Sequence, residues 1–115
     1  MLCNRIPWII VNDINALIVQ DADNLDAIGA IGIARTFTYS GCHNVPMYKE
    51  EIPIDINNKY IEGKNSASTI HHFYDKLLKQ GNYMNTATAR KIAKERTKYM
   101  EDFVKEFIKE WKAEF

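Results

Sequence analysis

A cluster of acidic side chains lies inside an apolar segment near the start of the chain. Residues 20–35 read QDADNLDAIGAIGIAR and place Asp21, Asp23 and Asp26 among leucine, isoleucine and alanine. Burying an ionised carboxylate costs several kcal/mol unless a metal ion, a basic side chain or the first turn of a helix compensates it. From residue types alone, capping and ion pairing explain this cluster better than a metal site does.

The spacing of these carboxylates indicates what they could do together. On a helix Asp23 and Asp26 share a face, whereas Asp21 points nearly opposite Asp23. Arg35 could bind a phosphate group through two parallel hydrogen bonds, or it could form an ion pair with a glutamate of the last helix. On one continuous helix Arg35 would stand ~18 Å from Asp23, at a rise of ~1.5 Å per residue.

His71 and His72 are the only adjacent histidines. Neighbouring residues on a helix diverge by about 100°, so these two cannot both chelate one metal from that helix. A hydrogen-bonded, half-buried imidazole is the simpler interpretation of His72, and contact with a substrate is the alternative.

Three amphipathic segments must position these residues. Apolar residues recur at three- and four-residue spacing over 14–38, 67–79 and 86–112, which predicts three helices and an all-α fold. Residues 40–65 form a long connection rich in proline, glycine and asparagine. Such a connection is either a lid over a site or an ordinary surface crossing.

The composition argues against a nucleic-acid-binding or membrane protein. The 115 residues carry fifteen basic and fifteen acidic side chains, so no general attraction to nucleic acid or to an anionic membrane is expected. Cys3 and Cys42 lack metal-ligand spacing and suit free thiols in the cytoplasm. The sequence shows neither a secretory signal nor a membrane span. We therefore expect a cytoplasmic protein with no nucleic-acid or membrane partner.

Five motifs carry a family resemblance. They are DADNLDAIGAIGIAR at 21–35, TFTYSG at 36–41, STIHHFYDKLL at 68–78, MNT at 84–86 and EFIKEW at 106–111. The first resembles the last motif of the HD-domain metal-dependent phosphohydrolases, in the small bacterial and archaeal branch. That branch usually has DADRLDAIGAIGIAR, so Asn24 departs from the pattern. The resemblance covers almost the whole chain from about residue 17 onward.

The resemblance implies an activity and roles for four residues. Asp23 matches the family's final metal-ligating aspartate, and Asp26 would orient the water or the substrate. Arg35 and His72 would contact substrate. The cofactor would be a divalent metal, one of Mn, Mg, Fe, Co, Ni or Zn, which activates a water to hydrolyse a phosphate ester. The expected partner is a phosphorylated small molecule or a nucleotide.

The rest of the family's metal site is missing from this chain. The family adds a histidine and an adjacent His-Asp pair before the final aspartate, but the first histidine here is His43 and no His-Asp pair occurs. We therefore interpret residues 1–115 as a single domain, the C-terminal portion of an HD helical bundle that lacks the upstream His and His-Asp helices. Metal should bind weakly or not at all, and the isolated chain should be inactive.

Two further expectations follow from an incomplete bundle. Leu17, Ile18, Leu25 and Ile28, together with residues 8–11, should lack helices to cover them. Either a homodimer or the missing N-terminal half would then bury this surface. The alternative to a phosphohydrolase is a non-catalytic helical interaction module or an inactive gene fragment.

Overall fold

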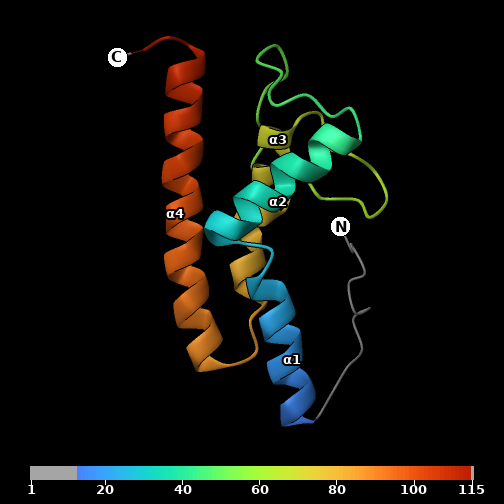
Figure 1. The fold of residues 1–115 in the computed structure, drawn as a ribbon, viewed down its shortest axis with the longest axis vertical. Coiled ribbons are helices and arrows are strands. Elements are labelled where there is room, and N and C mark those ends of the chain that lie inside the picture. The colour runs from blue at the N-terminus through green and yellow to red at the C-terminus, as the bar shows by residue number, and fades with distance from the viewer. Residues whose placement is uncertain (1–12, 115) are drawn as a thin grey trace.

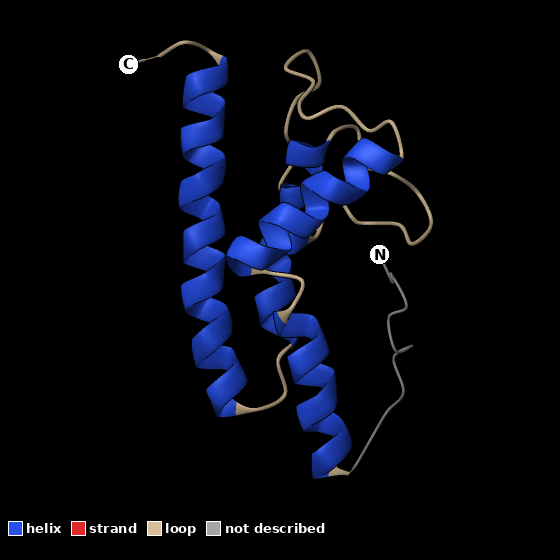
Figure 2. Ribbon diagram, in the orientation of Figure 1, coloured by secondary structure: helices blue, strands red, loops and turns tan. Residues whose placement is uncertain are grey.

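The chain folds into helices and turns. A computed structural model describes residues 13–114. The elements in order are α1 (Ile14–Leu25), α2 (Gly29–Cys42), α3 (Thr69–Asp75), the 3₁₀ helix η1 (Leu77–Tyr83) and α4 (Ala87–Trp111). The predicted all-α fold is confirmed, since the described range contains no strand (Figure 2).

The long helix α4 organises the others. It runs along one side of the molecule, with α1 near one end, α3 near the other and α2 lying obliquely between them (Figure 1). α4 contacts α1, α2 and η1, while α3 packs against α2 and η1. The largest fully buried side chains at these contacts are Ile28, Ile70, Phe73, Met100 and Val104. With Ile33 of α2, Leu77 of η1 and the adjoining Leu25 of α1, they form one core that joins all five helical elements.

The predicted helix over 14–38 is wrong, because it is two helices. Asp13 caps the start of α1, where its Oδ1 accepts a hydrogen bond from the Asn15 N–H at 3.0 Å. The helix ends at Leu25, and the chain turns before α2. Ile28 is extended, and Gly29 has a φ of +81°, a conformation that other residues rarely adopt. The break lies at residues 26–28.

The predicted helix over 67–79 is also interrupted. Ser68 caps α3, with its Oγ accepting from the His71 N–H at 3.2 Å. Lys76 leaves the helical conformation at φ −138° and ψ −58°, and the tighter η1 follows. Gly81 lies inside η1. The sequence showed the helical content of this stretch but not the change of helix type.

The third predicted helix, over 86–112, is confirmed. Thr86 caps α4, because its Oγ1 accepts from the Ala89 N–H at 3.2 Å. With 25 residues the helix is ~37 Å long. Charged side chains cover most of its outer surface. Across residues 13–114, no helix combines the length and the apolar character needed to cross a bilayer.

The apolar surface of α1 is only partly covered. Ile14, Ile18 and Val19 remain exposed, at 58%, 51% and 55% of their surface. The expectation that Leu25 and Ile28 would be uncovered is wrong, because Ile28 is buried and Leu25 packs against the core. The turn after α1 folds these two side chains inward. Residues 8–11 lie outside the described range.

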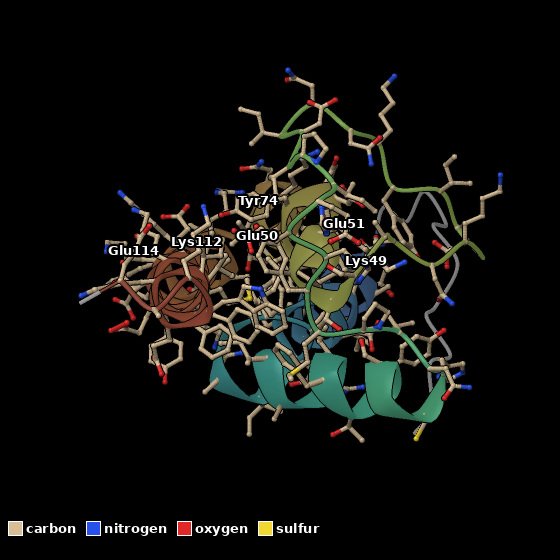
Figure 3. All side chains as sticks on the ribbon, turned by 90° about the horizontal axis from the view of Figure 1, so that it is seen from above. Lys49, Glu50, Glu51, Tyr74, Lys112 and Glu114 are labelled. Carbon is tan, nitrogen blue, oxygen red and sulfur yellow. The ribbon has the colours of Figure 1, made fainter. Side chains whose placement is uncertain are left out.

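The long connection is attached to α3 and η1. The Asn58 side-chain amide donates to Asp75 Oδ1 at 3.1 Å, and Lys79 Nζ donates to the Asn58 carbonyl at 2.7 Å. Seen along α4 in Figure 3, Lys49, Glu50 and Glu51 lie on this connection, whereas Lys112 and Glu114 lie at the end of α4. The connection therefore packs against the helices over part of its length.

The partly buried hydroxyl of Tyr74 should make the free energy of unfolding depend on pH in the alkaline range. Burial raises the pKa of its hydroxyl above the usual 10.0, and Tyr48 and Glu101 nearby raise that pKa further. Between pH 10 and the raised pKa, the unfolded chain releases a proton that the folded chain keeps, so the free energy of unfolding falls as pH rises. Tyr74→Phe should reduce the drop in melting temperature between pH 9 and pH 11. Tyr99→Phe, at an exposed position of α4, should leave the drop unchanged, and equal effects would contradict the assignment.

Candidate functional site

A cavity of about 310 Å³ lies between α1, α2, α3 and the long connection. Three of the four residues singled out in the sequence line it, namely Asp23, Arg35 and His72. Its other charged lining residues are Glu62, Lys64 and Lys76. Three cationic side chains and two carboxylates give the lining a formal excess of one positive charge, before His72 is counted. The cavity therefore favours an anionic ligand.

The break between α1 and α2 brings Asp23 and Arg35 to the same cavity. On one straight helix they would have stood far apart, but α2 turns back after residue 28. Arg35 Nη1 then donates a hydrogen bond to the backbone carbonyl of Asp26 at 3.4 Å, and Asp26 is the residue that caps the C-terminal end of α1. The predicted alternative, an ion pair between Arg35 and a glutamate of α4, is not the contact that the structure shows. Arg35 instead lies at the turn with its guanidinium beside the cavity.

Two glycines allow the backbone to pack closely at this turn. A Cβ on Gly32 would stand 2.4 Å from the Ala27 carbonyl oxygen, closer than real contacts allow. A Cβ on Gly29 would stand 3.0 Å from the Arg96 side chain. Arg96 in turn donates to the Leu25 carbonyl at 2.8 Å, which satisfies an open acceptor at the end of α1. Both glycines therefore allow a close approach that a side chain would block.

The two histidines have different surroundings. His71 is buried, with Nε2 donating to the Ile52 carbonyl at 3.0 Å and Nδ1 accepting from the Ser68 hydroxyl at 2.6 Å. It holds the long connection onto α3. His72 is half-buried, faces the cavity and has Nδ1 3.3 Å from Ser66 Oγ. His72 is therefore the histidine that a ligand could reach.

Sequence reasoning missed the lysines of the cavity. Lys76 follows His72 by four residues, the spacing that places two helical residues side by side. Its ammonium nitrogen lies 4.3 Å from the centre of the Tyr60 ring. Lys64 comes from the long connection, whose fold no local pattern predicted. The four-residue spacing from His72 was the available signal for Lys76.

Asp21 is the buried carboxylate of the acidic cluster. One oxygen accepts from the Asn85 N–H at 2.7 Å and from the Asn85 side-chain amide at 3.0 Å, while the other accepts from the Thr86 N–H at 2.9 Å. Only 2% of its surface is exposed. Asp21 is therefore compensated by the backbone N–H groups of the two residues directly before α4.

Asp26 and Asn24 have separate surroundings. Asp26 is exposed and is not among the residues that line the cavity, so its catalytic role stays a prediction. Asn24 Oδ1 accepts from Gln80 Nε2 at 3.0 Å. The Asn24 side-chain nitrogen is buried and meets no hydrogen-bond partner within residues 13–114. The amide thus forms part of the cavity floor, where the family usually has arginine.

The described residues do not fit a catalytic metal ion by themselves. Within residues 13–114, no three His, Cys, Asp or Glu side chains are grouped so as to hold one. Asp23 offers one exposed carboxylate at the cavity. Catalytic sites for such metals generally need three or more protein ligands. A metal at Asp23 would therefore need ligands from another segment.

Comparison with solved structures identifies close likenesses. An HD-superfamily hydrolase from Bacillus thuringiensis is 45% identical, with a TM-score of 0.75, and the match covers 89% of this chain and 48% of that one. A protein from Listeria innocua is 50% identical, with a TM-score of 0.72, over 88% of this chain and 49% of that one. No family model matches the chain.

A third likeness comes from a protein solved with a nucleotide. Bacillus subtilis YpgQ in complex with ADP is 37% identical, with a TM-score of 0.68, over 85% of this chain and 44% of that one. In sequence, YpgQ is 41% identical over 92 residues, which are 80% of this chain and 38% of YpgQ. The chain thus spans half or less of the length of the relatives it matches. In motifs, sequence and helical fold, the chain is similar to the HD superfamily of hydrolases over half or less of their length.

Proposed function

We propose that the chain supplies the phosphate-binding wall of an HD-type phosphohydrolase acting on a phosphorylated small molecule or a nucleotide. The observation that carries the proposal is the convergence of Asp23, Arg35 and His72 on one cavity with two lysines. The ADP bound to YpgQ supports a nucleotide as the ligand.

The cavity lining suits phosphate chemistry. An arginine can donate two parallel hydrogen bonds to phosphate oxygens, and a lysine ammonium offers a compact positive charge. Arg35 comes from α2 and Lys76 from the end of α3, so a phosphate between them would be held from two sides. His72 could donate a further hydrogen bond from its imidazole. Asp23 would repel the phosphate unless a cation lay between them, which agrees with its expected role as one metal ligand.

Hydrolysis would require groups that the described residues do not provide. The missing histidine and His-Asp ligands would come from another segment, whether of the same polypeptide or of a second chain. When bound, a divalent metal would supply an activated water. The residues of this chain would bind and orient the phosphate. We propose that the exposed apolar face of α1, formed by Ile14, Ile18 and Val19, is where the completing segment or a second copy packs.

The experiment that tests this proposal measures binding of inorganic pyrophosphate to the full chain by titration calorimetry. Arg35→Met should weaken binding by roughly tenfold, because it removes charge-assisted hydrogen bonds. The matched control is Arg90→Met, since Arg90 also bonds a backbone carbonyl, that of Asn85 at 3.0 Å, but lies outside the cavity. Circular dichroism should show that both variants fold.

Two results would contradict the proposal. One is a chain that shows no binding at millimolar pyrophosphate. The other is an equal loss of affinity in Arg35→Met and Arg90→Met. If the chain binds no pyrophosphate but sediments as a dimer that Ile18→Glu disrupts, the alternative of a helical interaction module is favoured. The exposed apolar residues of α1 are the observation behind that alternative.

A further inference from the structure

Tyr60 joins the long connection to two cavity residues of α3. The Lys76 ammonium lies over its ring at 4.3 Å, and the His72 imidazole meets the ring edge-on with centroids 5.4 Å apart. All three side chains line the cavity. The electron-rich face of an aromatic ring attracts a cation, so the ring determines where the Lys76 ammonium stands.

The backbone on both sides of Tyr60 is tied to the helices. Two residues before it, Asn58 bonds Asp75 and Lys79. Six residues after it, Ser66 lies within hydrogen-bond distance of His72. Because the connection is held on either side, the Tyr60 ring is a fixed surface against which a flexible lysine can be ordered.

We infer that Tyr60 is a positioning residue, which holds the Lys76 ammonium at the cavity wall where it meets a phosphate group of the ligand. The inference rests on the proposed function, since it needs an anionic ligand in this cavity. A lysine has a long flexible stem, and ordering that stem on binding costs conformational entropy. A ring that orders the ammonium beforehand lowers this cost. Tyr60 therefore strengthens phosphate binding by ordering the Lys76 ammonium.

The test is a double-mutant cycle on pyrophosphate affinity with the full chain. Tyr60→Leu should weaken binding about two- to fivefold, the range expected for an exposed cation–π contact. Tyr60→Phe keeps the ring and should stay within about twofold of the unaltered chain. On a Lys76→Met background, Tyr60→Leu should cause no further loss. As a second readout, the NMR signals of the Lys76 methylene next to the ammonium should lose their ring-current shift in Tyr60→Leu but keep it in Tyr60→Phe.

The outcomes separate this inference from the proposed function. If the unaltered chain binds pyrophosphate and Tyr60→Leu has no effect, or an effect that adds fully to that of Lys76→Met, the positioning role is wrong and the proposed function stands. If Tyr60→Phe loses as much affinity as Tyr60→Leu, the hydroxyl acts instead of the ring, and the inference is again overturned. A chain that binds no pyrophosphate overturns both.

Discussion

Replacing Asp21 with alanine should lower the free energy of unfolding by about 2–4 kcal/mol, because it removes a buried carboxylate and leaves its donors without partners. Those donors are the backbone N–H groups of Asn85 and Thr86, whereas the side-chain amide of Asn85 keeps Gln20 Oε1 as an acceptor. They precede the first turn of α4, so the loss should loosen the contact between α1 and α4. Urea unfolding followed by circular dichroism measures the change.

Asp23→Ala is the matched control for that experiment. Asp23 lies two residues away on the same helix, but its carboxylate is exposed. Its replacement should change the free energy of unfolding by less than about 0.5 kcal/mol. If the two variants unfold at the same urea concentration, Asp21 does not hold α1 to α4. This pair of variants also separates the structural aspartate of the cluster from the one at the cavity.

The acidic cluster shows what the sequence could and could not indicate. Helical spacing correctly placed Asp21 on the face opposite Asp23. It could not show which face packs inward, because the partners of Asp21 lie 64 and 65 residues later in the chain. Only the packing of α1 against the start of α4 selects the buried carboxylate. The caps Asp13, Ser68 and Thr86 were predictable for the opposite reason, since each acts within three residues of itself.

The turn between α1 and α2 could not be predicted from the sequence, because it too depends on contacts with residues distant in the chain. Apolar residues keep helical spacing straight through residues 26–28, so periodicity predicted one helix. The two glycines that follow are compatible with either a close helix contact or a change of direction. The positive φ of Gly29 shows a change of direction, and the contact that accompanies it, from Arg96 to the Leu25 carbonyl, comes from a residue 71 positions later in the chain. The convergence of Asp23 and Arg35 on one cavity depends on this turn and could not be read from their spacing.

Gly32→Ala should lower the free energy of unfolding by about 3 kcal/mol or more. The new methyl group would meet backbone atoms, the Ala27 carbonyl oxygen at 2.4 Å and its carbon at 2.6 Å. No side-chain rotation can relieve such a contact, so α2 must move away from the turn. Because Arg35 is carried by α2, pyrophosphate binding should weaken in the same variant. Urea unfolding and titration calorimetry measure the two effects.

Gly41→Ala is the control for Gly32→Ala within the same helix. A Cβ at Gly41 would meet no atom within 4 Å. Alanine favours the helix and restricts the unfolded chain, so this variant should gain about 0.5–1 kcal/mol of stability. Both substitutions replace glycine with alanine in the same helix. Opposite effects on stability would therefore show that the close contact between Gly32 and Ala27 causes the loss. A Gly32→Ala chain as stable as Gly41→Ala would mean that α2 does not pack against Ala27. The turn would then not be what brings Arg35 to the cavity of Asp23.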